Sequence, residues 1–333
     1  MTILTNTLTR FSLDNSIRED FADMIYDISP DDTPVMSAFG RGKAQSTYTE
    51  WQTDALAAAV TTNAQLDGDD IVSVTDSRAA TNKVGNYLQI SRKIITVSGT
   101  AQAVNNAGMR SKLAYELGKA GAELKTDIES SILAISTAVA GNTTVARVSA
   151  SLPQWIVTNW TGGGGTTAAR PQMTSGSAST DLDGTPSVGA VAGSTVTFTE
   201  TILKAMMKQL WTVGGKSINC WVGPVNKGVI STFSGIATRY LESKATQQAA
   251  IVGAADIYQG DFGRVTVVAD RFTTESIVII GDPAYGEVSW LRPISTDVMA
   301  KTGDSNKRMI IGEWTLKVRA QKAFASKWAA TTS

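Results

Sequence analysis

Histidine is absent from this chain of 333 residues, and cysteine occurs only once. Without histidine, Ser-His-Asp catalysis, Cys-His catalysis and imidazole metal sites are excluded. The single cysteine, Cys220, lies in the apolar run 218–222, which predicts a buried structural thiol rather than a nucleophile. No apolar run approaches a membrane span, and residues 1–11 lack the apolar core of a signal peptide. We therefore expect no catalytic centre, cofactor, metal site or membrane partner.

The net charge is zero, but the charges are unevenly distributed along the chain. Residues 1–70 hold four bases and twelve acids, a balance of 4 − 12 = −8. Residues 292–333 hold eight bases and three acids, a balance of 8 − 3 = +5. Either these are solvated faces, or the acidic front of one copy meets the basic end of another. The bases do not cluster with aromatic residues, so sequence-specific nucleic-acid binding is not predicted.

The most regular pattern is a run of apolar residues at steps of three and four from about Asn106 to Val139, a segment without proline. It predicts one helix, capped near Asn105 or Asn106 and ended by Gly141. Roughly thirty residues at about 1.5 Å each would form a rod about 45 Å long. Because only one side of the rod is apolar, we expect a sheet or a neighbouring chain to cover it.

Residues 1–45 predict an N-terminal arm with little core of its own. Ser16 and Glu19 form a capping box, which predicts a short amphipathic helix that ends before the prolines at positions 30 and 34. Its apolar face must dock on another surface. That face contains Ile17, Phe21, Met24, Ile25 and Ile28.

Residues 46–98 predict a long two-stranded ribbon. The outgoing limb, 47–53, is rich in β-forming residues and includes Trp51; Asp67–Asp70 has turn chemistry; the return limb covers 87–97. An isolated two-stranded ribbon is marginally stable in water. We therefore expect this ribbon to lie on another subunit.

The rest of the chain alternates loops with mixed α/β segments. Residues 142–195 are rich in Gly, Ser and Thr and predict an inserted surface loop or small subdomain with one apolar anchor. After a capping box at Thr197 and Glu200, a helix is expected to end at Gly214 and Gly215. The anchor contains Trp155, Ile156, Val157 and Trp160. Further strands are predicted at 218–222, 265–268, 277–280 and 313–319, and a further helix at 226–233.

Two short motifs resemble ligand-binding loops, but each lacks residues that the loop requires. Gly214–Ser217 resembles the end of a phosphate-binding loop, but Leu210 stands where that motif needs glycine, and a helix end explains the glycines. Asp67–Asp70 suggests a calcium loop, but Val72 and Arg78 stand where an EF-hand needs Gly and Glu. An acidic turn is the better interpretation.

Other polar and aromatic candidates favour structural roles. Glu123 and Asp127 are able in principle to do acid/base work, but they lie among lysines on the polar helix face, which favours a solvated or inter-subunit surface. The tryptophans are more typical of core or interface anchors than of ligand stacking. They include Trp51, Trp155, Trp160, Trp290 and Trp314.

Several short segments match, in order and spacing, the pattern of one known family. They are Ile28–Pro34, Glu50–Asp54, Leu113–Leu117, Glu123–Glu129, Phe262–Val265, Asp282–Ala284 and Ala300–Ser305. The chain thereby resembles the major capsid proteins of tailed bacteriophages, which have the Hong Kong-97-type fold. The resemblance spans nearly the whole chain except the Gly/Ser/Thr segment, in which no family motif is matched.

The resemblance implies an α+β fold with an N-terminal arm, an extended β-hairpin loop, a long spine helix in a peripheral domain, and a mixed α/β axial domain. It implies these bounds: arm 1–45, extended loop 46–98, peripheral domain 99–141 and 289–333, insertion 142–195, and axial domain 196–288.

It also implies a virion protein that assembles in the host cytoplasm into hexamers and pentamers of an icosahedral shell around double-stranded DNA. Portal, decoration and separate scaffolding proteins are the possible further partners, since about forty-five residues are too few for a built-in scaffold. Some relatives cross-link a lysine to an asparagine, but Lys83 and Lys93 carry no matching motif, so we expect a non-covalent shell.

We expect inter-subunit contacts at Ile17, Phe21, Trp51, Asp67, Asp69, Asp70, Glu123 and Asp127. The acidic residues at the ribbon tip are expected to lie near bases of an adjacent subunit. The alternatives are a tail or other virion structural protein, or a cellular shell-forming protein of the same fold; a soluble enzyme is the third.

Overall fold

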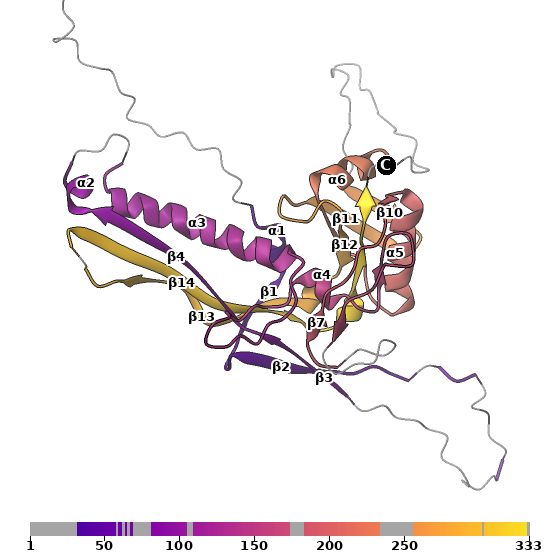
Figure 1. Ribbon diagram of the computed structural model, residues 1–333. Helices are drawn as coiled ribbons and strands as arrows, with labels where there is room; N and C mark the ends of the chain where they lie inside the picture. Colours follow the sequence, from indigo (N-terminus) through magenta and orange to yellow (C-terminus); the bar gives the residue numbers. More distant parts are fainter. Residues whose placement is uncertain are drawn as a thin grey trace, which may run out of the picture.

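A computed structural model describes residues 32–57, 59–61, 64, 67–68, 81–104, 109–173, 183–233, 256–301 and 303–331. An elongated part, in which one long helix lies along a sheet, joins a compact lobe built on a second sheet (Figure 1). A two-stranded ribbon leaves the body near the junction of the two parts (Figure 1).

The long helix is shorter than the apolar periodicity predicts. Helix α3 covers Lys112–Leu133, 22 residues, or about 33 Å. It begins at Ser111, whose hydroxyl accepts a hydrogen bond from the Ala114 amide, and a separate short helix, α2 (Gly99–Ala103), precedes it. After Leu133 the backbone becomes extended, and Val139 forms a β-bridge with Val148 instead of a helical turn. The expected cap at Asn105 or Asn106 lies outside the described residues, and the expected end at Gly141 is wrong.

Helix α3 packs on a four-stranded sheet of order β1-β13-β14-β4. Its buried stripe contains Ala120, Leu124, Ile128 and Ile132, as the sequence predicts. The helix lies over β4 and β14. The strands are β1 (Gly40–Lys43), β4 (Gln89–Ser98), β13 (Gly286–Val298) and β14 (Ser305–Val318).

The ribbon is shorter than predicted because its return limb divides. Strand β2 (Tyr48–Thr53) pairs antiparallel with β3 (Asn82–Tyr87). After Tyr87 the chain leaves the ribbon and β4 pairs with β14. The alternation of β4 accounts for this, because Ile95 and Val97 lie on the side that α3 covers, where they pack in the interior.

The lobe is built on a six-stranded sheet of order β10-β11-β9-β12-β15-β5. Helices α5 (Glu200–Thr212) and α6 (Pro224–Ser231) pack on it. The expected capping box at Thr197 is wrong, because Val196–Thr197 forms β8, paired with β16 (Ala330–Thr331), and α5 begins after Thr199. The sheet strands are β5 (Trp160–Thr161), β9 (Asn219–Val222), β10 (Ile257–Gly260), β11 (Gly263–Ala269), β12 (Val278–Gly281) and β15 (Phe324–Lys327).

The last strands lie in the lobe rather than beside the long helix. β14 ends at Val318, and β15 then inserts between β12 and β5. This pairing differs from the predicted grouping of residues 289–333 with the long helix. The local sequence agrees with this position: residues 323–330 are all buried, and all but Ser326 and Lys327 are apolar, as suits an interior strand of a covered sheet.

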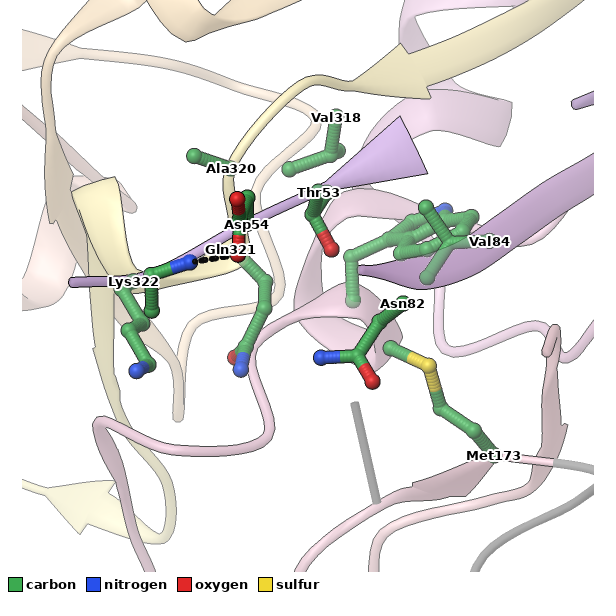
Figure 2. A pocket seen from close by; sticks show the side chains of 11 residues that line it. Thr53, Asp54, Asn82, Val84, Met173, Val318, Ala320, Gln321 and Lys322 are labelled. Carbon is green, nitrogen blue, oxygen red and sulfur yellow. Dashed lines mark hydrogen bonds between the residues drawn. The ribbon is translucent and has the colours of Figure 1, made fainter. Parts of the chain in front are cut away.

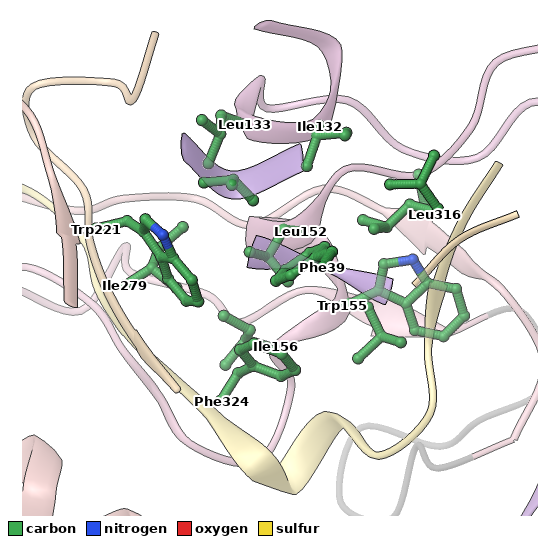
Figure 3. Packing of buried hydrophobic residues seen from close by; sticks show 14 of the residues in the cluster. Phe39, Ile132, Leu133, Leu152, Trp155, Ile156, Trp221, Ile279, Leu316 and Phe324 are labelled. Atoms are coloured by element: carbon green, nitrogen blue, oxygen red, sulfur yellow. The ribbon is translucent and has the colours of Figure 1, made fainter. Parts of the chain in front are cut away.

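The Gly/Ser/Thr-rich segment contributes directly to the core. Helix α4 (Leu152–Trp155) is entirely buried, and Ile156 and Val157 are also buried, so the predicted apolar anchor is confirmed. Its other described strands are β5, β6 (Gln172–Met173) and β7 (Pro186–Val188). Around α4, residues of both sheets meet Leu133 of α3 and Phe39 in one hydrophobic cluster (Figure 3). The sheet residues include Leu316 of the four-stranded sheet and Trp221, Ile279 and Phe324 of the six-stranded sheet.

Within the described residues, no helix is sufficiently long and apolar to cross a membrane.

Candidate inter-subunit surfaces

The acidic ribbon tip is described only in part. Asp67 is exposed, and Gly68 has φ of +79°, so the predicted turn is confirmed at these two residues. Asp69 and Asp70 lie outside the described residues, as do Ile17 and Phe21 of the arm.

Beyond β2, two large apolar side chains of the described ribbon residues are exposed. Leu56 is 99% exposed and Val60 is 68% exposed. Burying a side chain of this kind is worth roughly 1.5–3 kcal/mol. These residues therefore form a surface that gains free energy when another chain covers it.

Trp51 fixes the root of the ribbon to the body of its own chain. Its indole nitrogen donates a hydrogen bond to the Val318 carbonyl at 3.0 Å. Its ring lies 5.3 Å from the Trp155 ring, and the Lys317 ammonium lies over it at 5.8 Å. The structure thus gives Trp51 an intrachain role, and its expected contact with another subunit stays a prediction.

A small hollow of about 70 Å³ lies beside this root. Figure 2 shows it between the end of β2, Met173 of β6 and the segment from Val318 to Lys322. Pockets that bind small molecules usually enclose about 300–1,000 Å³. The hollow is therefore too small for a typical organic ligand.

Asn86, a residue that no sequence pattern singles out, links the root of the ribbon to the core. Its side chain is fully buried, and its amide nitrogen donates to Leu316 O at 2.7 Å, Ser149 Oγ at 3.0 Å and Ala150 O at 3.3 Å. Its oxygen accepts from the amides of Tyr87 and Ala150. One side chain thus joins β3, β14 and the segment before α4.

Glu123 and Asp127 are paired within the chain. Lys93 of β4 lies 2.8 Å from the Asp127 carboxylate and 3.9 Å from that of Glu123. The hydrogen bond that Lys93 donates to Asp127 raises the pKa of Lys93, although desolvation opposes it. Both carboxylates stay about half exposed, so their expected contact with another subunit is a prediction that this pairing leaves open.

Replacing Lys93 with methionine is expected to lower the stability of the unassembled subunit by less than about 1 kcal/mol, because partly exposed ion pairs contribute little. Urea unfolding of the two proteins measures the difference. A loss above about 2 kcal/mol would show that this pair is a principal support of α3.

A buried glutamate joins the long helix to the start of the described chain. Glu129 of α3 accepts hydrogen bonds from the amides of Val35, at 2.7 Å, and Met36, at 2.8 Å. These amides begin helix α1 (Pro34–Ala38). Burial raises the pKa of Glu129 to about 7, although the two amide hydrogen bonds lower it. The buried Asp270 carboxyl, whose pKa is also raised by burial, adds to the shift of Glu129.

The described residues hold no cluster of three or more acids or cysteines suited to a metal ion. Burial raises the pKa of the Cys220 thiol to about 12. Gly214, at the end of α5, has φ of +84° and terminates that helix, so it belongs to no phosphate loop. The candidate functional features of the described residues are therefore surface features, namely the exposed apolar residues Leu56 and Val60 and the half-exposed acids of α3.

Comparison with known proteins identifies the family. A family model described as SU10 major capsid protein matches residues 3–329. The chain belongs to this family. A curated major capsid protein of Escherichia phage Phieco32 is 37% identical over 125 residues, which are 36% of this chain and 33% of that protein. The match thus spans about a third of the length of that curated relative.

Solved structures establish the fold of this SU10-family chain. A Microbacterium phage Oxtober96 chain aligns with a TM-score of 0.61 and 11% identity over 96% of this chain and 98% of that one. A chain of the Cyanophage A-1(L) capsid asymmetric unit aligns with a TM-score of 0.61 and 11% identity, over 98% and 100%. The predicted α+β, Hong Kong-97-type capsid fold is confirmed.

Proposed function

We propose that this protein is the subunit of an icosahedral head shell of a tailed bacteriophage, which assembles into hexamers and pentamers and encloses double-stranded DNA. The observation that carries the proposal is the exposure of the apolar side chains Leu56 and Val60, whose burial by another chain would gain free energy. Membership of a major capsid protein family supports it. The role is structural rather than enzymatic, and the shell assembles in the host cytoplasm.

Electron microscopy of the expressed protein tests this function. Closed polyhedra are the expected result, whereas tubes or rings would favour a tail component. Monodisperse small particles would contradict a shell subunit. A second band in immature particles would reveal the separate scaffolding protein that we also propose; portal and decoration proteins are further expected partners.

Reversing the charge of the ribbon tip is expected to disrupt assembly. We propose that Asp67, Asp69 and Asp70 lie near bases of an adjacent subunit, so changing all three to lysine would replace attraction with repulsion. Particle yield by sedimentation should fall at least about tenfold, while changing the three to asparagine should have a smaller effect. Normal particles from the lysine variant would contradict the contact.

The shell is expected to be held by non-covalent contacts alone. Lys83 of the ribbon is paired with Glu50 at 2.7 Å and Lys93 with Asp127 at 2.8 Å, so both lysines already have intrachain partners. Boiling purified shells in detergent should release one band of about 35 kDa. A ladder of larger bands would contradict this prediction.

A further inference from the structure

A groove runs beside the long helix because one helix is too narrow to cover the sheet. Four strands spaced about 4.8 Å apart span roughly 19 Å, whereas a helix with its side chains is about 10 Å wide. Helix α3 covers β4 and β14. The neighbouring half of the face, over β13 and β1, forms a groove of about 970 Å³ (Figure 1 shows α3 along this sheet). Its width suits one additional helix.

The groove has an apolar floor and a basic rim. Trp290, Ile294 and Ile310 contribute to the floor. Arg41 and Lys43 of β1 form one side of the rim, and Lys125 of α3 forms the other. The residues that line the groove include no acid. Its chemistry therefore fits a segment that is apolar on one face and acidic on its flanks.

Two glycines of α3 line this groove. Gly118 and Gly121 lie within the helix, where glycine is less favourable than alanine. A Cβ added at either position would meet no atom of the described chain within 4 Å. Among the described residues, no contact requires glycine at either position. Glycine instead lets another backbone approach closely.

The N-terminal segment has the matching properties. Residues 16–28 predict an amphipathic helix with an apolar face, and they hold four acids and one base. The described chain begins at Asp32, and Met36 already lines the groove. The eight steps along the backbone from Ile28 to Met36 span at most about 29 Å, so the segment is tethered close to the groove.

We propose that residues 16–28 of this protein occupy the groove as a helix beside α3, with the face containing Ile17 and Phe21 on the sheet and the acids on the basic rim. The proposal rests on the proposed shell function in one respect: in a shell, the segment that fills the groove comes either from the same copy or from a neighbouring copy. We call this position of residues 16–28 in the groove the seat of the arm.

Cysteine trapping in the full chain tests this seat. Phe21→Cys combined with Gly121→Cys should form a disulfide on mild oxidation, and the native Cys220 is fully buried and should not compete. The matched control pairs Phe21→Cys with Lys119→Cys, an exposed position on the other flank of the same helix. We expect at least about tenfold more linked product from the Gly121 pair. A link within one chain or between two chains supports the seat, and its mass identifies which copy supplies the segment.

Equal yields from the two pairs would overturn the proposal. A second variant, Leu56→Cys with Gly121→Cys, is also able to overturn the proposal. If this pair forms more disulfide than the Phe21 pair, the ribbon of a neighbouring copy occupies the groove instead. If shells form normally but Phe21→Cys forms no disulfide with the groove, the proposed position of residues 16–28 is wrong and the shell function stands. If the disulfide forms but no shells form, the shell function is wrong and the proposed position stands.

Substitutions that change side-chain volume or charge in the groove test the proposed contacts separately from the stability of the fold. Gly118→Leu should lower the linked fraction several-fold without lowering the thermal midpoint of the subunit, because the added side chain meets open space. Lys125→Glu should also lower the linked fraction, and Asp20→Lys with Asp27→Lys should restore it. An unchanged linked fraction in both groove variants would contradict the proposed contacts.

Discussion

Replacing Asn86 with leucine is expected to destabilise the unassembled subunit by about 3–5 kcal/mol, the largest loss that we predict for a single substitution. Leucine has nearly the same size but neither donates nor accepts hydrogen bonds. The buried carbonyl of Leu316 and both the amide and the carbonyl of Ala150 would lose their partner. Each buried polar group left unpaired costs roughly 1–3 kcal/mol.

Urea unfolding of wild-type and variant subunits measures this loss. Asn82→Leu, at the other end of β3 and half-buried, is the matched control, and it should change the stability by less than about 1 kcal/mol. Asn86→Asp keeps the shape and an acceptor but loses both donated protons, so it should also be strongly destabilising. Similar midpoints for the Asn86 and Asn82 variants would show that the network contributes little.

The consequence extends to assembly because Asn86 holds the root of the ribbon. The ribbon root is also held by hydrogen bonds between β2, β3 and residues 183–185, but Asn86 is its fully buried link to β14 and to the segment before α4. If the network is lost, we expect the ribbon to vary in direction, and particle yield should fall more than the loss of subunit stability alone would explain.

The elements that the sequence predicted well are those with strong local patterns. The buried stripe of α3 and the strands around Cys220 and Ile279 follow from periodicity and apolar runs that any single chain reveals. The helix boundary failed at its C-terminal end because Ile135 and Val139 continue the apolar spacing, while tertiary contacts draw the chain into a bridge with Val148.

The parts that could not be predicted depend on pairing between distant segments. The return limb of the ribbon changes partners after Tyr87, and nothing local distinguishes a ribbon strand from a sheet strand with the same alternation. The roles of Asn86 and Glu129 are similarly long-range, since Glu129 bonds to residues 93 and 94 positions away. A single asparagine or glutamate in a sequence carries no signal of such partners.

Glu129 is expected to make the subunit less stable as pH rises through the range from about 5 to 8. Its pKa in the folded protein is about 7, above the value of 4.5 for an unburied glutamate. Between these values the folded state binds more protons than the unfolded state, so stability is fully present below about 4.5 and is lost as pH rises through 7. At about 1.4 kcal/mol per pH unit, the loss reaches at most about 3 kcal/mol.

Glu129→Gln isolates this effect from other titrating groups. Urea midpoints of both proteins at several pH values between 5 and 8 should show wild type losing stability relative to the variant as pH rises. Glu123→Gln, a half-exposed glutamate of the same helix, serves as control and should run nearly parallel to wild type. Parallel curves for Glu129→Gln as well would mean that Glu129 is ionised throughout this range.

Burial is the main reason that the pKa of Glu129 is raised, and Asp270 adds to the shift. The Asp270 carboxyl is buried, and within the described residues its Oδ2 atom has no hydrogen-bond donor. A proton on Glu129 supplies the missing donor and removes the repulsion between two buried carboxylates. Asp270→Asn should remove that repulsion and supply donors of its own, so the pH range in which stability is lost should move downward. A range that stays in place would show that burial alone raises the pKa of Glu129.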